Sequence, residues 1–270
     1  MGLTGRGYDG AVTEPTAAAL ARLYDLDLVD DPGDGDLYLA LAARSGGPVL
    51  ELAVGTGRLA LPLAAAGHEV TGVDIDPAML ERARRRAAAA GRSVERRLRF
   101  VEGDIRTVRL PEAGSFGLAF LALNSLMLLG DRFSQLAALA TMAAHLAPGG
   151  LAVVDVWLPD ADDLARFDGR LSLEYPRTDP ETGRLVTKIA SAVHDAATGT
   201  VRLATIYEEG RPGEPAVRWF REDRLRLVSA DELRAGAEAA GLEVELVAGS
   251  YDLEPLGPGA ERAILVAVRR

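Results

Sequence analysis

Two glycines and one acidic residue in the first third of the chain have the spacing of a ligand site. Gly55 and Gly57 follow an apolar run at 49–54, and Asp74 ends a second apolar run at 70–73. Glycine has no β-carbon, so the backbone can turn sharply here and a ligand can approach it closely. An acid at the end of the next strand can accept hydrogen bonds from both hydroxyls of a ribose. These residues predict a nucleotide-like ligand.

The elements that must position these residues alternate between strand and helix. A helix from 59 to 66 ends at Gly67, and its amino end directs free N–H groups toward the ligand. Apolar runs and helical spacing continue the pattern further along the chain. We expect strands at 49–54, 70–73, 97–101, 116–123 and 151–157, and helices at 59–66, 78–90 and 132–146. This order predicts an α/β fold with a doubly wound, Rossmann-like parallel sheet.

The first strand and its glycine loop carry a family signature. Glu51, Ala53, Gly55 and Gly57 match the motif Glu/Asp-x-Ala/Gly-x-Gly-x-Gly, and Asp74 matches the acid that ends the second strand. The chain therefore resembles the class I S-adenosylmethionine-dependent methyltransferases. The turn at 147–150, Ala-Pro-Gly-Gly, is also typical of that family. The resemblance implies a seven-stranded sheet closed by an antiparallel pair, here at 242–248 and 263–268.

Other readings of the glycine loop stay open. The segment from Gly55 to Ala60 also satisfies the G-x-G-x-x-G/A fingerprint of dinucleotide-binding proteins. The alternatives are an NAD(P)-binding oxidoreductase and a noncatalytic S-adenosylmethionine-binding protein.

The resemblance implies a set of contacts with S-adenosylmethionine. Tyr24 matches a helical pattern whose tyrosine reaches the methionine end of the cofactor, although it could equally pack its own helix. Asp104 and Ile105 match positions beside the adenine, with a simple turn role for Asp104 as the alternative. The resemblance assigns these residues to the cofactor site: Tyr24, Glu51, Ala53, Gly55, Thr56, Gly57, Asp74, Ile75, Met79, Asp104, Ile105, Leu123 and Asn124.

The acceptor side is less defined by the sequence. Asn124-Ser125-Leu126 occupies the family's fourth motif but departs from the Asp/Asn-Pro-Pro-Tyr/Phe form that methylates base or amide nitrogens. We therefore expect methyl transfer to nitrogen or oxygen of a small molecule by in-line displacement. No catalytic base is assigned, and His194 is a candidate. Other residues that could line the pocket are Asp155, Trp157, Tyr175, Tyr207 and Glu208. No metal site is predicted.

The chain divides into four predicted units. Residues 1–46 form a helical lid, with a cap at Thr13, and residues 47–167 form the cofactor-binding core. From 168 to 228, β-rich runs separated by turn signals predict an inserted antiparallel subdomain on the substrate side. Residues 229–270 return to the core. The layout loosely resembles that of amino-sugar N-methyltransferases.

The composition limits the classes of partner and the kinds of site that we expect. The 270 residues carry a formal net charge of −10 and no cysteine, which disfavours nucleic acid and excludes disulfides and thiolate metal sites. Eight arginines between 82 and 99 are predicted to form a solvated face. No apolar run is long enough to cross a bilayer, and the amino terminus has no signal core, so we expect a cytoplasmic protein. A homodimer is a candidate assembly.

Overall fold

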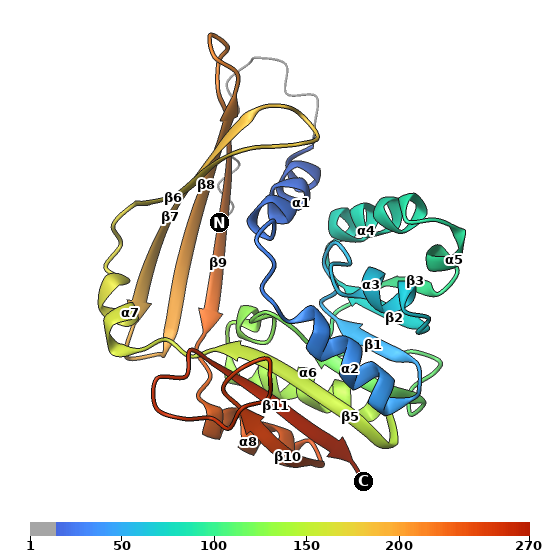
Figure 1. The fold of residues 1–270 in the computed structure, drawn as a ribbon. Helices are drawn as coiled ribbons and strands as arrows, with labels where there is room; N and C mark the ends of the chain where they lie inside the picture. Colours follow the sequence, from blue (N-terminus) through green and yellow to red (C-terminus); the bar gives the residue numbers. More distant parts are fainter. Residues whose placement is uncertain (1–14) are drawn as a thin grey trace.

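The computed structural model describes residues 15–270 and contains two separate sheets (Figure 1). The larger sheet has seven strands in the order β10-β11-β5-β4-β1-β2-β3. Strands β1 to β5 run parallel, and β11 pairs antiparallel with both β5 and β10. These strands are β1 (Val49–Leu52), β2 (Val70–Asp74), β3 (Leu98–Glu102), β4 (Phe116–Leu121), β5 (Leu146–Trp157), β10 (Leu242–Ala248) and β11 (Arg262–Arg269). The predicted fold class is confirmed.

Helices cover both faces of this sheet, because its central strands are apolar on both sides. One buried cluster joins β1 and β4 to α2 (Gly35–Ser45), α3 (Ala60–Ala65) and α4 (Pro77–Ala89). The opposite cluster joins the sheet to α6 (Arg132–His145) and α8 (Ala230–Ala239). Strands β1, β2 and β4 are buried at every residue, as expected for parallel strands between two helical layers.

The second sheet is the insertion. It is antiparallel, in the order β6 (Ser172–Thr178), β7 (Leu185–Asp195), β8 (Thr200–Gly210) and β9 (Val217–Arg226). It extends away from the carboxyl end of β5, and α1 (Thr16–Asp27) lies between this sheet and α4 (Figure 1). Leu23 and Leu26 of α1 pack against Tyr207 and Trp219 of the inserted sheet. One face of the insertion is therefore turned toward the lid helix.

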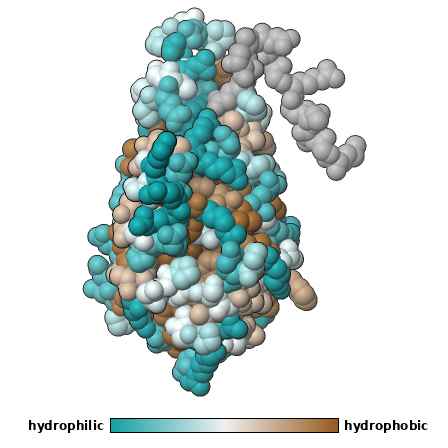
Figure 2. All heavy atoms as spheres, turned by 90° about the vertical axis from the view of Figure 1, so that its right-hand side faces the viewer, coloured by the Kyte–Doolittle hydropathy of each residue, from teal (hydrophilic) through white to brown (hydrophobic). Residues whose placement is uncertain are grey.

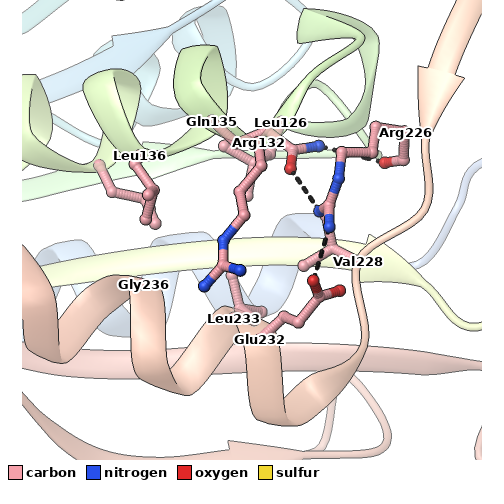
Figure 3. A pocket seen from close by; sticks show the side chains of 10 residues that line it. Leu126, Arg132, Gln135, Leu136, Arg226, Val228, Glu232, Leu233 and Gly236 are labelled. Atoms are coloured by element: carbon pink, nitrogen blue, oxygen red, sulfur yellow. Dashed lines mark hydrogen bonds and ion pairs between the residues drawn. The ribbon is translucent and has the colours of Figure 1, made fainter. Parts of the chain in front are cut away.

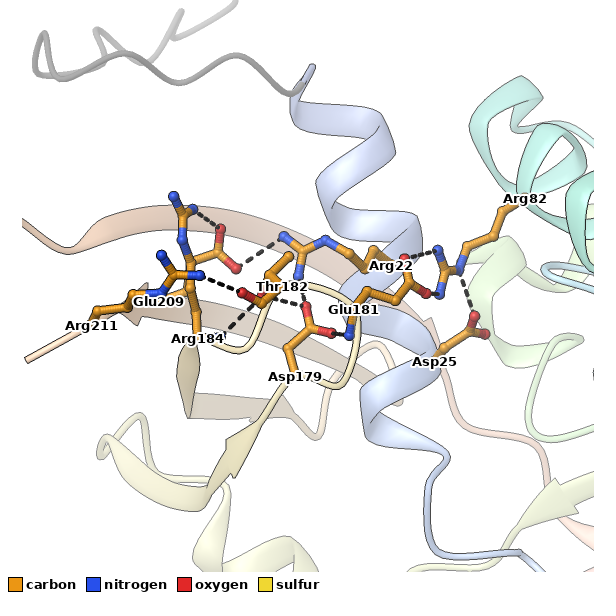
Figure 4. Close-up of polar contacts among 9 residues, drawn as sticks. All are labelled: Arg22, Asp25, Arg82, Asp179, Glu181, Thr182, Arg184, Glu209 and Arg211. Atoms are coloured by element: carbon orange, nitrogen blue, oxygen red, sulfur yellow. Dashed lines mark hydrogen bonds and ion pairs between the residues drawn. The ribbon is translucent and has the colours of Figure 1, made fainter.

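Buried ion pairs join the lid helix to the insertion (Figure 4). Arg22 is buried and binds Asp179, and its Nη2 donates to Glu209 Oε2 at 2.9 Å. Glu181, from the same turn, binds Arg82 of α4. A single turn of the insertion thus contacts both α1 and α4.

The chain returns from β9 to the core beside a small pocket between α6 and α8 (Figure 3). Arg226 and Val228 line this pocket. Arg226 donates to Gln135 Oε1 at 2.9 Å and to Glu232 Oε1 at 2.6 Å. Glu232 also forms a capping box with Ser229 at the start of α8. These contacts fix the base of the insertion on the core.

Several details differ from the expected elements. The 147–150 turn lies inside β5, where Gly149 has a φ of 80° and the pairing with β4 shifts register. Three short helices were not expected: α5 (Arg92–Glu95), η1 (Met127–Leu129) and α7 (Ala161–Arg166). Each is too short to produce a clear apolar period. The expected cap at Thr13 lies outside the described residues.

Candidate active site

The glycine loop and Asp74 are joined directly. The Gly55 N–H donates to Asp74 Oδ2 at 2.7 Å, and the Asp76 N–H donates to Asp74 Oδ1 at 2.9 Å. Burial raises the pKa of Asp74, while these backbone donors act in the opposite direction. The carboxylate that the sequence places at the end of β2 therefore lies against the glycine loop.

Strained backbone marks the same edge of the sheet. Ala53, Leu123 and Asn124 have φ values of 58°, 45° and 65°, in the left-handed region that favours glycine. They follow β1 and β4, two neighbouring strands. Such strain persists where the surrounding structure enforces it, and it is concentrated at functional sites.

Tyr24 covers the glycine loop from the lid helix. A β-carbon placed on Gly55 would lie 3.7 Å from Tyr24 Cε1, so the phenol packs over the loop. Burial raises the pKa of the Tyr24 hydroxyl. At the next residue of the helix, Asp25 Oδ1 accepts a hydrogen bond of 2.5 Å from the hydroxyl of the buried Thr56. The lid helix therefore touches two residues of the glycine loop.

Glu51 is the most perturbed acid of the site. It is buried within β1, and its Oε2 has no hydrogen-bond partner within residues 15–270. Burial raises its pKa to about 8, and the positive charge of Arg58 acts in the opposite direction. Arg58 is itself held by Asp34, through two hydrogen bonds of 2.6 Å. Glu51 is thus an unsatisfied buried carboxyl that a ligand cation would complete.

The residues that the resemblance assigns to the adenine side have different surroundings in the structure. Asp104 Oδ1 accepts from the Arg106 backbone N–H at 2.9 Å, and the Arg106 guanidinium lowers the Asp104 pKa. In this structure Asp104 therefore caps its own turn. Ile105 is buried in the core, whereas the Ile75 side chain is 65% exposed beside the end of β2. Met79 is buried in α4.

His194 is the penultimate residue of β7. It is in register with Val201, and its backbone N–H donates to the Phe167 carbonyl at 3.0 Å. The Phe167 ring lies 5.8 Å from the Trp157 ring at the end of β5. The sequence did not indicate these contacts, because they depend on how the chain folds back after β5.

Comparison with known proteins decides the family. A family model described as a methyltransferase domain matches residues 49–150. The cypemycin N-terminal methyltransferase of a Streptomyces species is 31% identical over 96% of this chain and all of the relative. The chain belongs to the S-adenosylmethionine-dependent methyltransferases.

Further relatives extend the similarity over the inserted sheet. The dTDP-3-amino-3,4,6-trideoxy-alpha-D-glucopyranose N,N-dimethyltransferase of Streptomyces venezuelae is 30% identical, over 85% of the methyltransferase described here and 92% of the relative. Among solved structures, the CcbJ methyltransferase from Streptomyces caelestis has a TM-score of 0.73 and 27% identity, covering 90% of this chain and 96% of that one.

The residues of the site fit S-adenosylmethionine, the cofactor of the methyltransferase. Glu51 Oε2, which has no hydrogen-bond partner within residues 15–270, would accept from the cofactor's ammonium group, and Asp74 would accept from ribose hydroxyls. Gly57 has a φ of 80°, in the left-handed region that favours glycine. The oxidoreductase and noncatalytic alternatives find no support in the comparisons. None of the helices within residues 15–270 is long and apolar enough to cross a membrane.

Proposed function

We propose that the methyltransferase transfers a methyl group to the amine nitrogen of a small-molecule acceptor. The observation that carries this proposal is the similarity along the inserted sheet as well as the core. The two relatives with that coverage are named as an N-terminal methyltransferase and an N,N-dimethyltransferase of a dTDP-amino sugar. A shared insertion supports a shared class of acceptor, because insertions of this kind carry specificity on a common core.

The inner face of the inserted sheet supplies polar groups for such an acceptor. Thr205 pairs in register with Arg221, whose guanidinium binds Asp223 Oδ2 at 2.6 Å and Oδ1 at 2.9 Å. The positive charge of Arg221 acts on Tyr24, opposing the burial that raises the tyrosine pKa. We propose that Arg221 and Tyr24 border one site. Figure 2 shows the side of the molecule that lies on the right of Figure 1, with hydrophobic residues in its middle and hydrophilic residues around them.

Methyl transfer requires the protein mainly to position the acceptor nitrogen and to exclude water from the site. Bound S-adenosylmethionine supplies an electrophilic methyl group on a positively charged sulfur. The protein must hold the nitrogen lone pair in line behind that methyl group and exclude water. The backbone at Asn124 is the proposed platform for the amine, and Tyr24 is the proposed cover. An ammonium acceptor must first lose a proton, and His194 is the proposed base.

The four predicted units have matching proposed roles. Residues 1–46 act as the lid, 47–167 as the cofactor-binding core, 168–228 as the acceptor side and 229–270 as the return to the core. We propose a cytoplasmic location and no nucleic-acid partner. The second point is supported by the ion pairs of Arg82 and Arg99 with carboxylates.

We also propose a homodimer formed through the outer face of the inserted sheet. Leu173, Ile189, Ile206 and Phe220 are paired in register across all four strands, and Leu173 and Phe220 are 65% and 59% exposed. Cross-strand ion pairs lie on both sides of this apolar row: Arg218 with Glu208, and Arg202 with Glu222. Both signs of charge on each side allow a second copy to face the first with opposite charges matched.

Mass spectrometry of methyl acceptors tests the proposed reaction. The probes are the dTDP-3-amino sugar of the Streptomyces relative and the same sugar nucleotide with a hydroxyl in place of the amine. We expect the amine probe to gain one or two methyl groups from S-adenosylmethionine and the hydroxyl probe to gain none. Methylation of the hydroxyl probe at an equal rate would overturn the assignment to nitrogen.

A further inference from the structure

The turn that follows β4 is held in a costly conformation. Leu123 and Asn124 are consecutive residues with φ values of 45° and 65°. Each left-handed residue other than glycine costs roughly 1 kcal/mol or more, and leucine has no side-chain hydrogen bond with which to offset that cost. Neighbouring groups must therefore enforce this turn.

Three hydrogen bonds to the end of β5 hold the turn. The Asn124 N–H donates to the Asp155 carbonyl at 3.1 Å, and the Trp157 N–H donates to Asn124 Oδ1 at 2.6 Å. The Leu123 N–H points to Asp155 Oδ2 at 3.4 Å. The Asp155 side chain is fully buried, so its orientation depends on the groups around it.

Those groups come from the last part of the chain. The Tyr251 hydroxyl donates to Asp155 Oδ2 at 2.9 Å, and Arg262 Nη1 donates to Asp155 Oδ1 at 2.5 Å. The Arg262 guanidinium also lies 4.3 Å from the centre of the Tyr251 ring. Each carboxylate oxygen thus has a partner outside β4 and β5, and one of them also faces the strained turn.

We propose that Asp155, Tyr251 and Arg262 form a positioning unit that fixes the Leu123–Asn124 turn on the acceptor side of the active site. The three residues act through the turn and do not contact the reacting atoms. A buried ion pair is often no more stabilising than a well-packed apolar substitute, so stability gives little reason to bury this one. The hydrogen bonds that Asp155 accepts from the strained turn provide a reason for burying this ion pair.

The unit predicts a specific pattern of kinetic change. Loss of the Tyr251 hydroxyl should loosen the turn and misplace the acceptor, while the glycine loop and Asp74 stay as they are. A loss of about 1 kcal/mol of hydrogen bonding corresponds to a severalfold to tenfold fall in kcat. The KM for S-adenosylmethionine should change less than kcat, because the glycine loop and Asp74 keep their positions even where the Leu123–Asn124 turn loosens.

The test compares Tyr251→Phe with Tyr175→Phe. Tyr175 also donates its hydroxyl to a carboxylate, Asp27, but that carboxylate keeps Tyr207 and Lys188 and does not contact the 123–124 turn. Hydrogen exchange of the peptide covering residues 121–127 is followed by mass spectrometry, together with the affinity for S-adenosylhomocysteine. We expect faster exchange in this peptide for Tyr251→Phe alone, with a loss of affinity in either variant that is smaller than the fall in kcat.

A second pair of variants, Arg262→Lys and Arg262→Met, separates positioning from folding. Lysine keeps a cation for Asp155 and should restore much of the kcat that methionine loses. The kinetic measurements rest on the proposed amine methylation, whereas the hydrogen-exchange measurement does not. A failure of the proposed function can therefore be distinguished from a failure of the positioning unit. Unchanged exchange at 121–127 in Tyr251→Phe would overturn the positioning unit, as would a loss of melting temperature with kcat unchanged.

Discussion

At the scale of single residues, Glu51 determines how the stability of the protein depends on pH. Its pKa is about 8 in the folded protein, against an ordinary value of 4.5, because burial disfavours the charged carboxylate more strongly than the positive charge of Arg58 favours it. The folded state therefore holds a proton that the unfolded chain releases. The free energy of unfolding should fall as pH rises from about 4.5 toward 8, by on the order of 4 kcal/mol in total.

The variant Glu51→Gln tests this dependence. Glu51→Gln removes the titrating group. Between about pH 5 and pH 8, the melting temperature of the variant should therefore fall much less than that of the wild type. The control is Glu81→Gln, because Glu81 is 61% exposed on the surface of α4 and should leave the wild-type profile unchanged. Saturating S-adenosylmethionine should flatten the wild-type profile by supplying a cation to Glu51. Parallel profiles for wild type and Glu51→Gln would contradict this account.

The sequence could predict residues whose roles follow from local spacing. Gly55, Gly57 and Asp74 lie together as expected, because the strand-loop-helix-strand pattern fixes their arrangement. Asp155 and Arg262 could not be paired in this way. They lie 107 residues apart, and their contact depends on the register between β5 and β11.

At the scale of elements, α1 is held against the core by one carboxylate. Asp25 Oδ2 binds Arg82 Nε at 2.5 Å, and Asp25 Oδ1 accepts from Arg86 at 3.2 Å as well as from Thr56. Because Thr56 belongs to the glycine loop, the position of the lid and the shape of the cofactor site are linked. The sequence predicted a helical lid over residues 1–46, but the partners of α1 on α4 follow only from tertiary packing.

Weakening this contact should weaken cofactor binding. In Asp25→Asn the charge is lost but the shape is kept, and we expect the dissociation constant for S-adenosylmethionine to rise about fivefold to tenfold. Glu81→Gln is again the control, since it removes a carboxylate that faces Arg85 of α4 at 3.9 Å on the exposed surface. Calorimetric titration measures both variants. Equal affinity in Asp25→Asn and wild type would show that the lid contact does not support the site.

At the scale of the whole molecule, the inserted sheet presents two different faces. The inner face packs on α1 and borders the proposed acceptor site, while the outer face carries the exposed apolar row. The β-rich runs and turn signals predicted an antiparallel subdomain at 168–228. The alignment of the row across four strands could not be predicted, because it depends on the pairing register.

Sedimentation tests the proposed dimer through that face. Phe220→Glu places a charge at the β9 end of the apolar row and should convert a dimer into a monomer. Phe133→Glu is the matched control, because Phe133 is 88% exposed at the start of α6, outside the inserted sheet. A wild-type monomer, or a dimer that persists in Phe220→Glu and dissociates in Phe133→Glu, would rule out this interface.

The most direct test of the cofactor site is calorimetric titration of wild type and Asp74→Asn with S-adenosylmethionine and NAD. Asp74→Asn keeps an oxygen for the Gly55 N–H but loses the charged acceptor for ribose hydroxyls. We expect the wild type to bind S-adenosylmethionine and not NAD, and the variant to bind it about tenfold to a hundredfold more weakly. Undiminished binding in Asp74→Asn would contradict the placement of the cofactor between the glycine loop and the end of β2.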